Sequence, residues 1–476
     1  MSRERREEME QVKIVMVPFA AQGHLNQLLH FAINLSSTYV DLPVHYACSA
    51  SYVRQAKSRI QGRDSASLEK VHFHELPLPP FPSPPPDPAA NFPSHLVPSF
   101  EAAMELRAPL AALFLSLSVG CRRLVVVHDP MMSFVSSDVA SLPNAESYRF
   151  QCVPSYNELQ HFCRQPDYDA SRLRREVLDV ILDPFEGCFS PEFRAFVVDN
   201  YIDVAAEAGT LFNSCRTIDG EFLDLLSGVP RYRGKKLFAV GPLNPLAIER
   251  GLSSHKCLEW LDEQPPASVL YVSFGSTSTM SDEQIERLAT GLERSGQRFI
   301  WVLRDADLGD IFAADGDGGN GIGRRELPAG FEERVKGRGM VVRGWAPQLP
   351  ILAHPSTGGF MSHCGWNSCM ESLSMGVPIV AWPVHSDQPR NAVMVTEYLR
   401  TGVAVREWAR LRDPVSSEAI EKAIGKVMVV QFCDEEGKEM RKRARLLGEA
   451  IRLSVAEGGS SRADMDSFVQ HITRDA

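Results

Sequence analysis

The chain has 476 residues, of which 44% are apolar and 23% are charged, the composition of an ordinary globular protein. At roughly 100–200 residues per domain, this length predicts about two to four domains that need no disulfide staples. The 50 basic and 60 acidic residues give a formal charge of −10. That is the wrong sign for a protein that binds nucleic acid through a basic surface.

The chain carries no signal for a membrane or for export. Its longest apolar run, Pro109–Gly120, is shorter than the roughly 18–20 residues that a membrane-spanning helix needs. The N-terminal sequence MSRERREEMEQ lacks the apolar core of a secretory signal. The ten cysteines form no C-x-x-C pair and fit no zinc spacing. We therefore expect a cytoplasmic, monomeric protein with reduced thiols and no integral membrane segment.

The N-terminal half alternates between strand-like and helix-like segments. An apolar run, Val12–Pro18, is followed by the short loop 19–24 and then by apolar residues at helical spacing. Further strands are predicted at Val44–Ala47, Val71–Glu75 and Leu124–His128. Strands without polar alternation are buried on both faces, as in a parallel sheet covered by helices. The predicted fold class is therefore α/β.

Segments between these elements suggest a pocket and a domain boundary. The proline-rich stretch Leu76–Pro98 and the segment Ala145–Tyr156 are predicted to be loops that line an acceptor pocket. The segment Gly241–Leu252, marked by proline and glycine, is predicted to be a linker. After it the alternation of strands and helices resumes.

The second half repeats the same alternation. Ser281 and Gln284 form a capping box that predicts the start of a helix. The tail from Cys433 onward is predicted to form two helices that are broken near Glu457. The strands predicted in this half are Ser268–Phe274, Arg298–Leu303, Met340–Arg343, Gly359–Ser362, Pro378–Trp382 and Val403–Arg406.

Two motifs in the glycine- and aspartate-rich stretch 305–325 are interpreted as decoys. Gly316–Gly321 matches the G-x-G-x-x-G dinucleotide fingerprint, but no predicted strand leads into it and no helix follows. Asp315 and Asp317 resemble a metal-binding D-x-D pair, yet they also lack a flanking strand, and solvated acidic loops are common. A nicotinamide dehydrogenase is therefore the weakest hypothesis for this chain.

The stretch 345–388 carries most of the chemical information. Its strand Gly359–Ser362 runs into a tight turn, and a helix is predicted to begin near Trp366. The free N–H groups and the positive dipole end of such a helix point to the carboxyl edge of the sheet, where phosphate groups bind. Asn367 adds a side-chain donor, and Glu371 lies on the same helix face, where its carboxylate can accept ribose hydroxyls.

This stretch, W-A-P-Q … H-C-G-W-N-S … D-Q, resembles the plant secondary-product glycosyltransferase box. That box is the donor-binding signature of the family 1 UDP-sugar glycosyltransferases. The loop with Gly23 and His24, the segment Val127–Asp129 and the segment Ser273–Ser276 resemble further parts of that family. The resemblance therefore covers nearly the whole chain.

The resemblance implies the GT-B fold, in which two Rossmann-like domains face each other across a cleft. The implied acceptor-binding domain comprises 1–245, joined by a C-terminal helix at about 458–476. The implied UDP-sugar-binding domain comprises 246–457. No metal and no cofactor are implied, because UDP-glucose itself is the co-substrate.

By motif match, the residues implied to bind the UDP-sugar are Ser276, Trp345, Ala346, Gln348, His363, Trp366, Asn367, Ser368, Glu371, Asp387 and Gln388. Trp345 would stack on the uracil, and Gln348 and Glu371 would hold the ribose. The diphosphate would be bound near the helix start by His363 and its hydroxyl and amide neighbours in this set.

The sugar itself would be bound by Trp366, Asp387 and Gln388. In the family that the chain resembles, a final glutamine is usual for enzymes that use glucose. Gln388 therefore favours UDP-glucose as the donor.

His24 and Asp129 are the candidate catalytic pair. Each follows a predicted strand at its carboxyl end, so both side chains can meet in one crevice of the sheet. The imidazole would act as general base on an acceptor hydroxyl, and the carboxylate would stabilise the imidazolium. The resemblance implies an inverting reaction with this pair. Alternatively, Asp129 caps the segment that follows it, and His128 competes by adjacency, although strand alternation points it to the opposite face.

The chain departs from many relatives at Gln27, where they have a proline three residues after the histidine. This glutamine, the proline-rich Leu76–Pro86 and the run Val384–Arg390 resemble the zeatin O-glucosyltransferase-like branch of the family. The hypothesis is therefore glucosyl transfer from UDP-glucose to a hydroxyl of a small hydrophobic plant acceptor, with zeatin first. Alternatives are a flavonoid or other phenolic acceptor, UDP-xylose as donor, and a non-catalytic UDP-sugar-binding protein.

Overall fold

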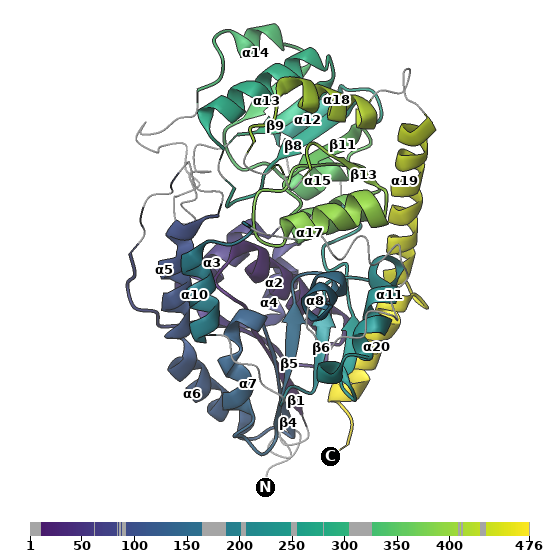
Figure 1. The fold of residues 1–476 in the computed structure, drawn as a ribbon. Coiled ribbons are helices and arrows are strands. Elements are labelled where there is room, and N and C mark those ends of the chain that lie inside the picture. The colour runs from purple at the N-terminus through teal and green to yellow at the C-terminus, as the bar shows by residue number, and fades with distance from the viewer. Residues whose placement is uncertain are drawn as a thin grey trace.

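The protein consists of two lobes, each built on a parallel β-sheet and stacked one above the other (Figure 1). The structure is a computed structural model. It describes residues 11–475 except 61, 83, 85–86, 88–91, 164–186, 201–205, 249–254, 279, 304–325, 408–409, 411–412 and 429–434. The stretch 305–325, with both of its motifs, therefore lies outside the described residues.

The first sheet has seven strands in the order β3-β2-β1-β4-β5-β6-β7, and all of its pairings are parallel. The strand order reverses between β1 and β4, which makes their carboxyl ends a topological switch point. The strands are β1 (Val12–Val17), β2 (Val44–Ser49), β3 (Val71–Leu76), β4 (Arg123–His128), β5 (Ala145–Gln151), β6 (Gly209–Phe212) and β7 (Lys236–Ala239). The helices are α2 (Gln22–Thr38), α3 (Ala50–Arg59), α4 (Ser65–Glu69), α5 (Val97–Met104), α6 (Arg107–Ser118), α7 (Phe134–Val139), α8 (Ser155–Phe162), α10 (Pro191–Asn200) and α11 (Arg216–Ser227).

The second sheet has six strands in the order β10-β9-β8-β11-β12-β13, again all parallel. The strands are β8 (Val269–Ser273), β9 (Arg298–Val302), β10 (Gly339–Val342), β11 (Thr357–Ser362), β12 (Ile379–Ala381) and β13 (Gly402–Ala404). The helices are α12 (Lys256–Asp262), α13 (Asp282–Arg294), α14 (Phe331–Arg334), α15 (Gln348–Leu352), α16 (Trp366–Met375), α17 (Gln388–Val393), α18 (Ser417–Met428), α19 (Glu435–Val455) and α20 (Ser460–Ile472). The switch point of this sheet lies between β8 and β11, so α16 begins beside it.

The structure confirms the α/β class and every strand predicted from apolar runs, with ends that differ by a few residues. The predicted loop Ala145–Tyr156 is wrong, because it contains β5 and the start of α8. β5 includes polar residues that are buried and paired with carboxylates outside the strand. Arg149 donates to Glu207 at 2.9 Å, and Gln151 donates to Glu158 at 3.0 Å. From the sequence of the strand alone, these polar residues predict an exposed loop, because their partners lie outside the strand.

The capping box predicted at α13 is half present. The Ser281 hydroxyl accepts a hydrogen bond from the Gln284 backbone N–H at 3.2 Å, as expected. The Gln284 side chain does not return to the helix start. Its amide exchanges two hydrogen bonds with the backbone of Val415, at 3.0 and 2.8 Å, and so ties α13 to the approach of α18.

The last two helices join the lobes. α19 packs on α16 in the upper lobe, and α20 crosses back onto the first sheet, where it contacts β7 (Figure 1). Phe468 of α20 is fully buried against Phe31, Tyr148 and Phe238, with ring centroids 6.0, 5.3 and 5.5 Å away. Arg123 donates to the Ile472 carbonyl at 2.6 Å and thereby satisfies the helix end. The exact boundary between the two domains stays a prediction.

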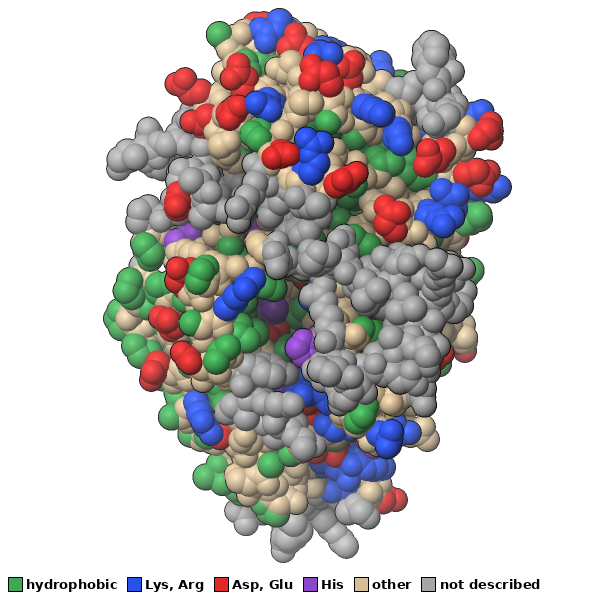
Figure 2. Space-filling view, viewed as in Figure 1, with side chains coloured by type: hydrophobic (Ala, Val, Ile, Leu, Met, Phe, Trp, Pro, Cys, Tyr) green, Lys and Arg blue, Asp and Glu red, His purple; other side chains and the backbone are tan. Residues whose placement is uncertain are grey.

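The surface of the upper lobe has acidic and basic side chains interspersed, without a field of one sign on the face shown in Figure 2. A mixed surface of this kind agrees with the negative net charge of the chain, whereas a surface that binds nucleic acid is mainly basic. Among the described residues, none of the helices is both long enough and apolar enough to cross a bilayer.

Replacing Phe468 by alanine is expected to lower the free energy of unfolding by about 3–5 kcal/mol, the usual cost of deleting a buried aromatic ring. Leu453→Ala, on the neighbouring helix and 69% exposed, serves as the control and should change it by less than about 0.5 kcal/mol. Urea unfolding of both variants measures the difference. Equal stability of the two variants would show that α20 is not part of the core.

Candidate functional site

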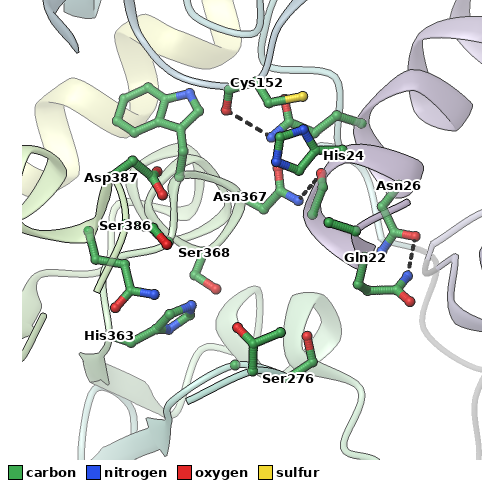
Figure 3. A pocket seen from close by; sticks show the side chains of 18 of the residues that line it. Gln22, His24, Asn26, Cys152, Ser276, His363, Asn367, Ser368, Ser386 and Asp387 are labelled. Carbon is green, nitrogen blue, oxygen red and sulfur yellow. Dashed lines mark hydrogen bonds between the residues drawn. The ribbon is translucent and has the colours of Figure 1, made fainter. Parts of the chain in front are cut away.

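A cavity of about 310 Å³ lies between the lobes, at the carboxyl ends of both sheets. It is lined from below by the β1–α2 loop and by α2, and from above by the segments that follow β8, β11 and β12. All the residues that the motif match assigned to the UDP-sugar lie in its wall, together with His24. Asp129 lies behind His24 and is fully buried. Figure 3 shows His24 and Cys152 on one side of this pocket, with His363 and Asp387 on the other.

His24 and Asp129 form a direct hydrogen bond. His24 Nδ1 lies 2.5 Å from Asp129 Oδ2, and the imidazole is one-third exposed to the cavity. The other carboxylate oxygen of Asp129 accepts the Met131 N–H at 2.9 Å, so this residue is both the cap and the partner of the histidine. Because a carboxylate only accepts, His24 Nδ1 carries the proton and Nε2 is left as the base.

The field around His24 favours its charged form. Burial alone lowers the pKa of the imidazole, but the charge and hydrogen bond of Asp129, with a contribution from Asp387, raise the pKa above its ordinary value. Asp387 belongs to the upper lobe, so both lobes act on this histidine. An imidazole in this environment can hold a proton taken from a ligand.

His128 points away from the cavity, as strand alternation predicted. Its Nδ1 lies 2.9 Å from the Asp129 carbonyl oxygen, and its Nε2 lies 2.8 Å from the Ser136 hydroxyl. Burial lowers its pKa, so it is a neutral core histidine. His128 is absent from the cavity wall, whereas His24 is part of it.

α16 points its N-terminus at the cavity. Gly365, at its N-cap, offers no side chain to the free backbone N–H groups of the first turn. A Cβ on Gly365 or on Gly275 would lie 2.5 or 2.6 Å from His363 Nε2, so a side chain at either position would displace that imidazole; Gly275 also has a positive φ of 77°. This packing fixes the imidazole of His363 beside the helix start, where a phosphate is favoured.

His363 is a neutral donor rather than a cation. It is buried, and burial lowers its pKa to about 4. Its Nδ1 has no hydrogen-bond partner within the part of the chain that the structure describes. A buried nitrogen without a partner is costly, and a bound diphosphate oxygen would satisfy it. Ser276 lines the same side of the cavity.

The residues implied to hold the ribose are bonded to one another. The Gln348 amide donates to Ser368 Oγ at 2.9 Å and to Glu371 Oε2 at 2.7 Å. Burial raises the pKa of Glu371 to about 7, and the bond from Gln348 opposes this shift. The neighbouring indole of Trp345 has the Arg59 guanidinium 5.6 Å from its ring centroid. These groups can therefore present acceptors and a flat face to a nucleoside.

Asp387 and Gln388, at the end of the motif, differ in the hydrogen bonds that their side chains already make. Gln388 Oε1 accepts the backbone N–H groups of Val384 and His385, at 2.9 and 3.0 Å, so this oxygen mainly shapes the turn. Asp387 accepts from Asn391 at 2.6 Å and lines the cavity. Burial raises the pKa of Asp387.

Trp366 and Asn367 reach into the other lobe instead of only facing a sugar. The indole N–H of Trp366 donates to the Asn213 carbonyl oxygen at 2.6 Å, and the side chain is buried. The amide of Asn367 donates to the Gly23 carbonyl oxygen at 2.9 Å, beside His24. These two hydrogen bonds join the start of α16 to the first lobe, one of them at the loop that carries His24.

Several further residues lie in the wall, and two of them, Phe92 and Cys152, belong to the stretches Leu76–Pro98 and Ala145–Tyr156 that were predicted to line a pocket. Cys152 donates its S–H to Asp129 at 3.5 Å. The rings of Phe19, Phe92, Phe100 and Phe193 form an apolar wall, with Phe19 and His24 in edge contact at 5.7 Å. Isolated phenylalanines in different segments have no common spacing, so only the fold brings them together.

The described residues also contain one mixed set of metal-binding atom types. His24, Asp129 and Cys152 each place a ligand atom within 4.8 Å of the others. Two members of this set, His24 and Asp129, form the hydrogen bond described above, so the set is part of the same site.

The architecture and the pocket together define a glycosyltransferase with the GT-B fold. A family model for the N-terminal domain of glycosyltransferases matches residues 10–245, and the model "UDP-glucoronosyl and UDP-glucosyl transferase" matches residues 253–436. The chain belongs to this family of UDP-glycosyltransferases.

Named relatives agree over the full length. The chain is 47% identical to the zeatin O-glucosyltransferase of Phaseolus lunatus, with 97% of each chain covered. It is 45% identical to the zeatin O-xylosyltransferase of Phaseolus vulgaris, with 97% of this chain and 98% of that one covered. A solved UGT transferase from Siraitia grosvenorii in complex with UDP is 28% identical, with a TM-score of 0.75 over 98% of this chain and all of that one.

Replacing Asp129 by asparagine removes the charge that raises the pKa of His24, so the pKa of the histidine should fall. The base is active when deprotonated, so the acidic limb of the pH profile of kcat/KM should move to lower pH. The plateau value of kcat/KM should fall as well, because the asparagine amide stabilises the His24 imidazolium less than the aspartate carboxylate does. Rate measurements across the acidic range with native and variant protein test this. An unmoved limb would show that His24 does not set it.

Proposed function

We propose that this protein transfers glucose from UDP-glucose to a hydroxyl of zeatin, with inversion at the anomeric carbon. The observation that carries the proposal is the 2.5 Å contact between His24 and Asp129 at the mouth of a pocket whose opposite wall is the N-terminus of α16. Full-length similarity to zeatin O-glycosyltransferases supports the acceptor.

The proposed reaction follows from the position of each group. His24 Nε2 takes the proton of the acceptor hydroxyl while the oxygen attacks the anomeric carbon. The bond from that carbon to the diphosphate breaks, and the UDP leaves with the bonding electrons. The negative charge that develops is stabilised by the first turn of α16 and by His363. This arrangement supplies the electrostatic help without a metal ion, so we propose that none is required.

The lower wall of the pocket supports a flat, uncharged acceptor. Phe92 and Phe193 contact each other with centroids 4.9 Å apart, and Phe100 lies beside them. These rings suit an aromatic heterocycle packed face or edge on. A phenolic acceptor would use the same wall, and the xylosyl relative makes UDP-xylose the alternative donor.

The acceptor is tested by product mass after incubation with UDP-glucose and a panel of trans-zeatin, cis-zeatin, dihydrozeatin and flavonols. We expect an O-hexoside on a zeatin, formed at the same rate with and without EDTA. UDP-xylose in a parallel series tests the donor. Turnover confined to flavonols would overturn the acceptor proposal. UDP-glucose binding without any product would favour the non-catalytic alternative.

His24→Ala should lower kcat by roughly 10²–10⁴-fold, because it removes the general base. The dissociation constant of UDP, measured by titration calorimetry, should change little, since the nucleotide pocket belongs to the upper lobe. His128→Ala is a poor control because His128 is buried in the core. His161→Ala is used for comparison, because His161 is an exposed histidine on α8 that lies outside the cavity wall. Near-native turnover of His24→Ala would refute its assignment as base.

A further inference from the structure

Gln27 is a buried amide three residues after His24 on α2. Residues three apart share one helix face, so Gln27 projects on the same side as the histidine. Only 3% of it is exposed, which makes the fate of its polar atoms energetically important.

Both ends of this amide are used. Gln27 Nε2 donates to the Cys152 carbonyl oxygen at 3.0 Å, just after β5. Gln27 Oε1 accepts from Asn213 Nδ2 at 2.9 Å, just after β6. The side chain therefore spans the carboxyl ends of two neighbouring strands and fixes α2 against both of them.

The contact with Cys152 leads to Asp129, the carboxylate that holds His24. The same Cys152 whose carbonyl is held by Gln27 directs its thiol to Asp129 Oδ2 at 3.5 Å. Asp129 in turn holds His24. The hydrogen bond from Gln27 thus fixes the backbone of Cys152, whose side chain contacts the Asp129 carboxylate.

The contact with Asn213 leads to α16, the helix proposed to bind the donor. Asn213 accepts the indole N–H of Trp366 on its backbone carbonyl at 2.6 Å, and its side-chain oxygen accepts the Leu243 N–H at 3.2 Å. Trp366 is the first residue of α16, and Leu243 lies in the segment that connects the two sheets. Asn213 is therefore the point where the lower lobe, the connection and the donor helix meet.

We propose that Gln27 is a positioning residue, which fixes the His24–Asp129 pair in register with the donor helix through Cys152 on one side and Asn213 on the other. Gln27 takes no part in proton transfer. It supplies one donor and one acceptor in a fixed direction, which a proline or an aliphatic side chain at this position does not. Correct placement of reacting groups is worth large factors, and a shift of about 1 Å can cost about 10²-fold in rate.

Gln27→Leu keeps the bulk of the side chain and removes both hydrogen bonds. We expect kcat to fall about 10–10²-fold, while the dissociation constant of UDP stays within about twofold, because the Asn213 carbonyl that holds Trp366 remains. Gln151→Leu is the matched control. Gln151 is a buried amide on β5, one residue before Cys152. Within the described chain, the one side-chain hydrogen bond given for it is to Glu158.

Both variants leave buried polar groups with fewer partners, so both should lose some thermal stability. Only the Gln27 variant should lose turnover to the stated extent. If Gln151→Leu lowers kcat equally, or if Gln27→Leu keeps kcat within about twofold of the native value, the positioning role is overturned.

Gln27→Glu gives a second and independent readout. Its carboxylate can still accept from Asn213 but would face the Cys152 carbonyl, so the variant should be impaired at neutral pH. Burial raises the pKa of a carboxyl group, and the protonated form can donate to Cys152 as the amide does. The activity of Gln27→Glu relative to the native chain should therefore rise as the pH falls. A constant ratio across the pH range would contradict the proposal.

This inference rests on the proposed function, and the two can fail separately. Failure of the native chain to glucosylate any acceptor of the panel would count against the acceptor. The variants would then be compared by their hydrolysis of UDP-glucose, in which water replaces the acceptor. A hydrolysis rate that is equal in the native chain and in Gln27→Leu would overturn the role of Gln27.

Discussion

The parallel pairing of β1 with β4 is the constraint on which the site depends. In its register Val17 lies opposite His128, so the loop that carries His24 and the residue that follows β4 leave the sheet side by side. No other strand pair of the first sheet leaves a crevice there, because the strand order reverses at this point. The short distance between His24 and Asp129 is therefore a property of the sheet, and the side chains only complete it.

The second sheet brings the opposite charge pattern to the same place. α16 begins at the switch point beside β8 and β11, and its first two residues reach across the cleft to Asn213 and to Gly23. A helix end that attracts negative charge is thus held directly above a histidine that attracts a proton. Each lobe therefore contributes one part of the site: the upper lobe the start of α16, and the lower lobe His24.

Much of this arrangement follows from the sequence, and the exceptions have a common cause. Long apolar runs such as Val12–Val17 identify buried parallel strands, and the spacing around Trp366 identifies the donor helix. β5 was missed because Arg149 and Gln151 look solvent-exposed until Glu207 and Glu158 are found beside them. Gln284, Trp366 and the phenylalanine wall differ from simple expectation for the same reason. Their partners lie far away along the chain, and only the fold determines them.

The return of α20 to the first sheet has a consequence for how the chain is made. The apolar surface formed by Phe31, Tyr148 and Phe238 is complete once β7 has been synthesised, but Phe468, which covers it, emerges only near the end of translation. The first lobe therefore leaves the ribosome with this apolar surface exposed, while more than two hundred further residues are still being added. A chain cut after the first sheet would retain that face permanently, which makes the N-terminal half a poor candidate for expression on its own.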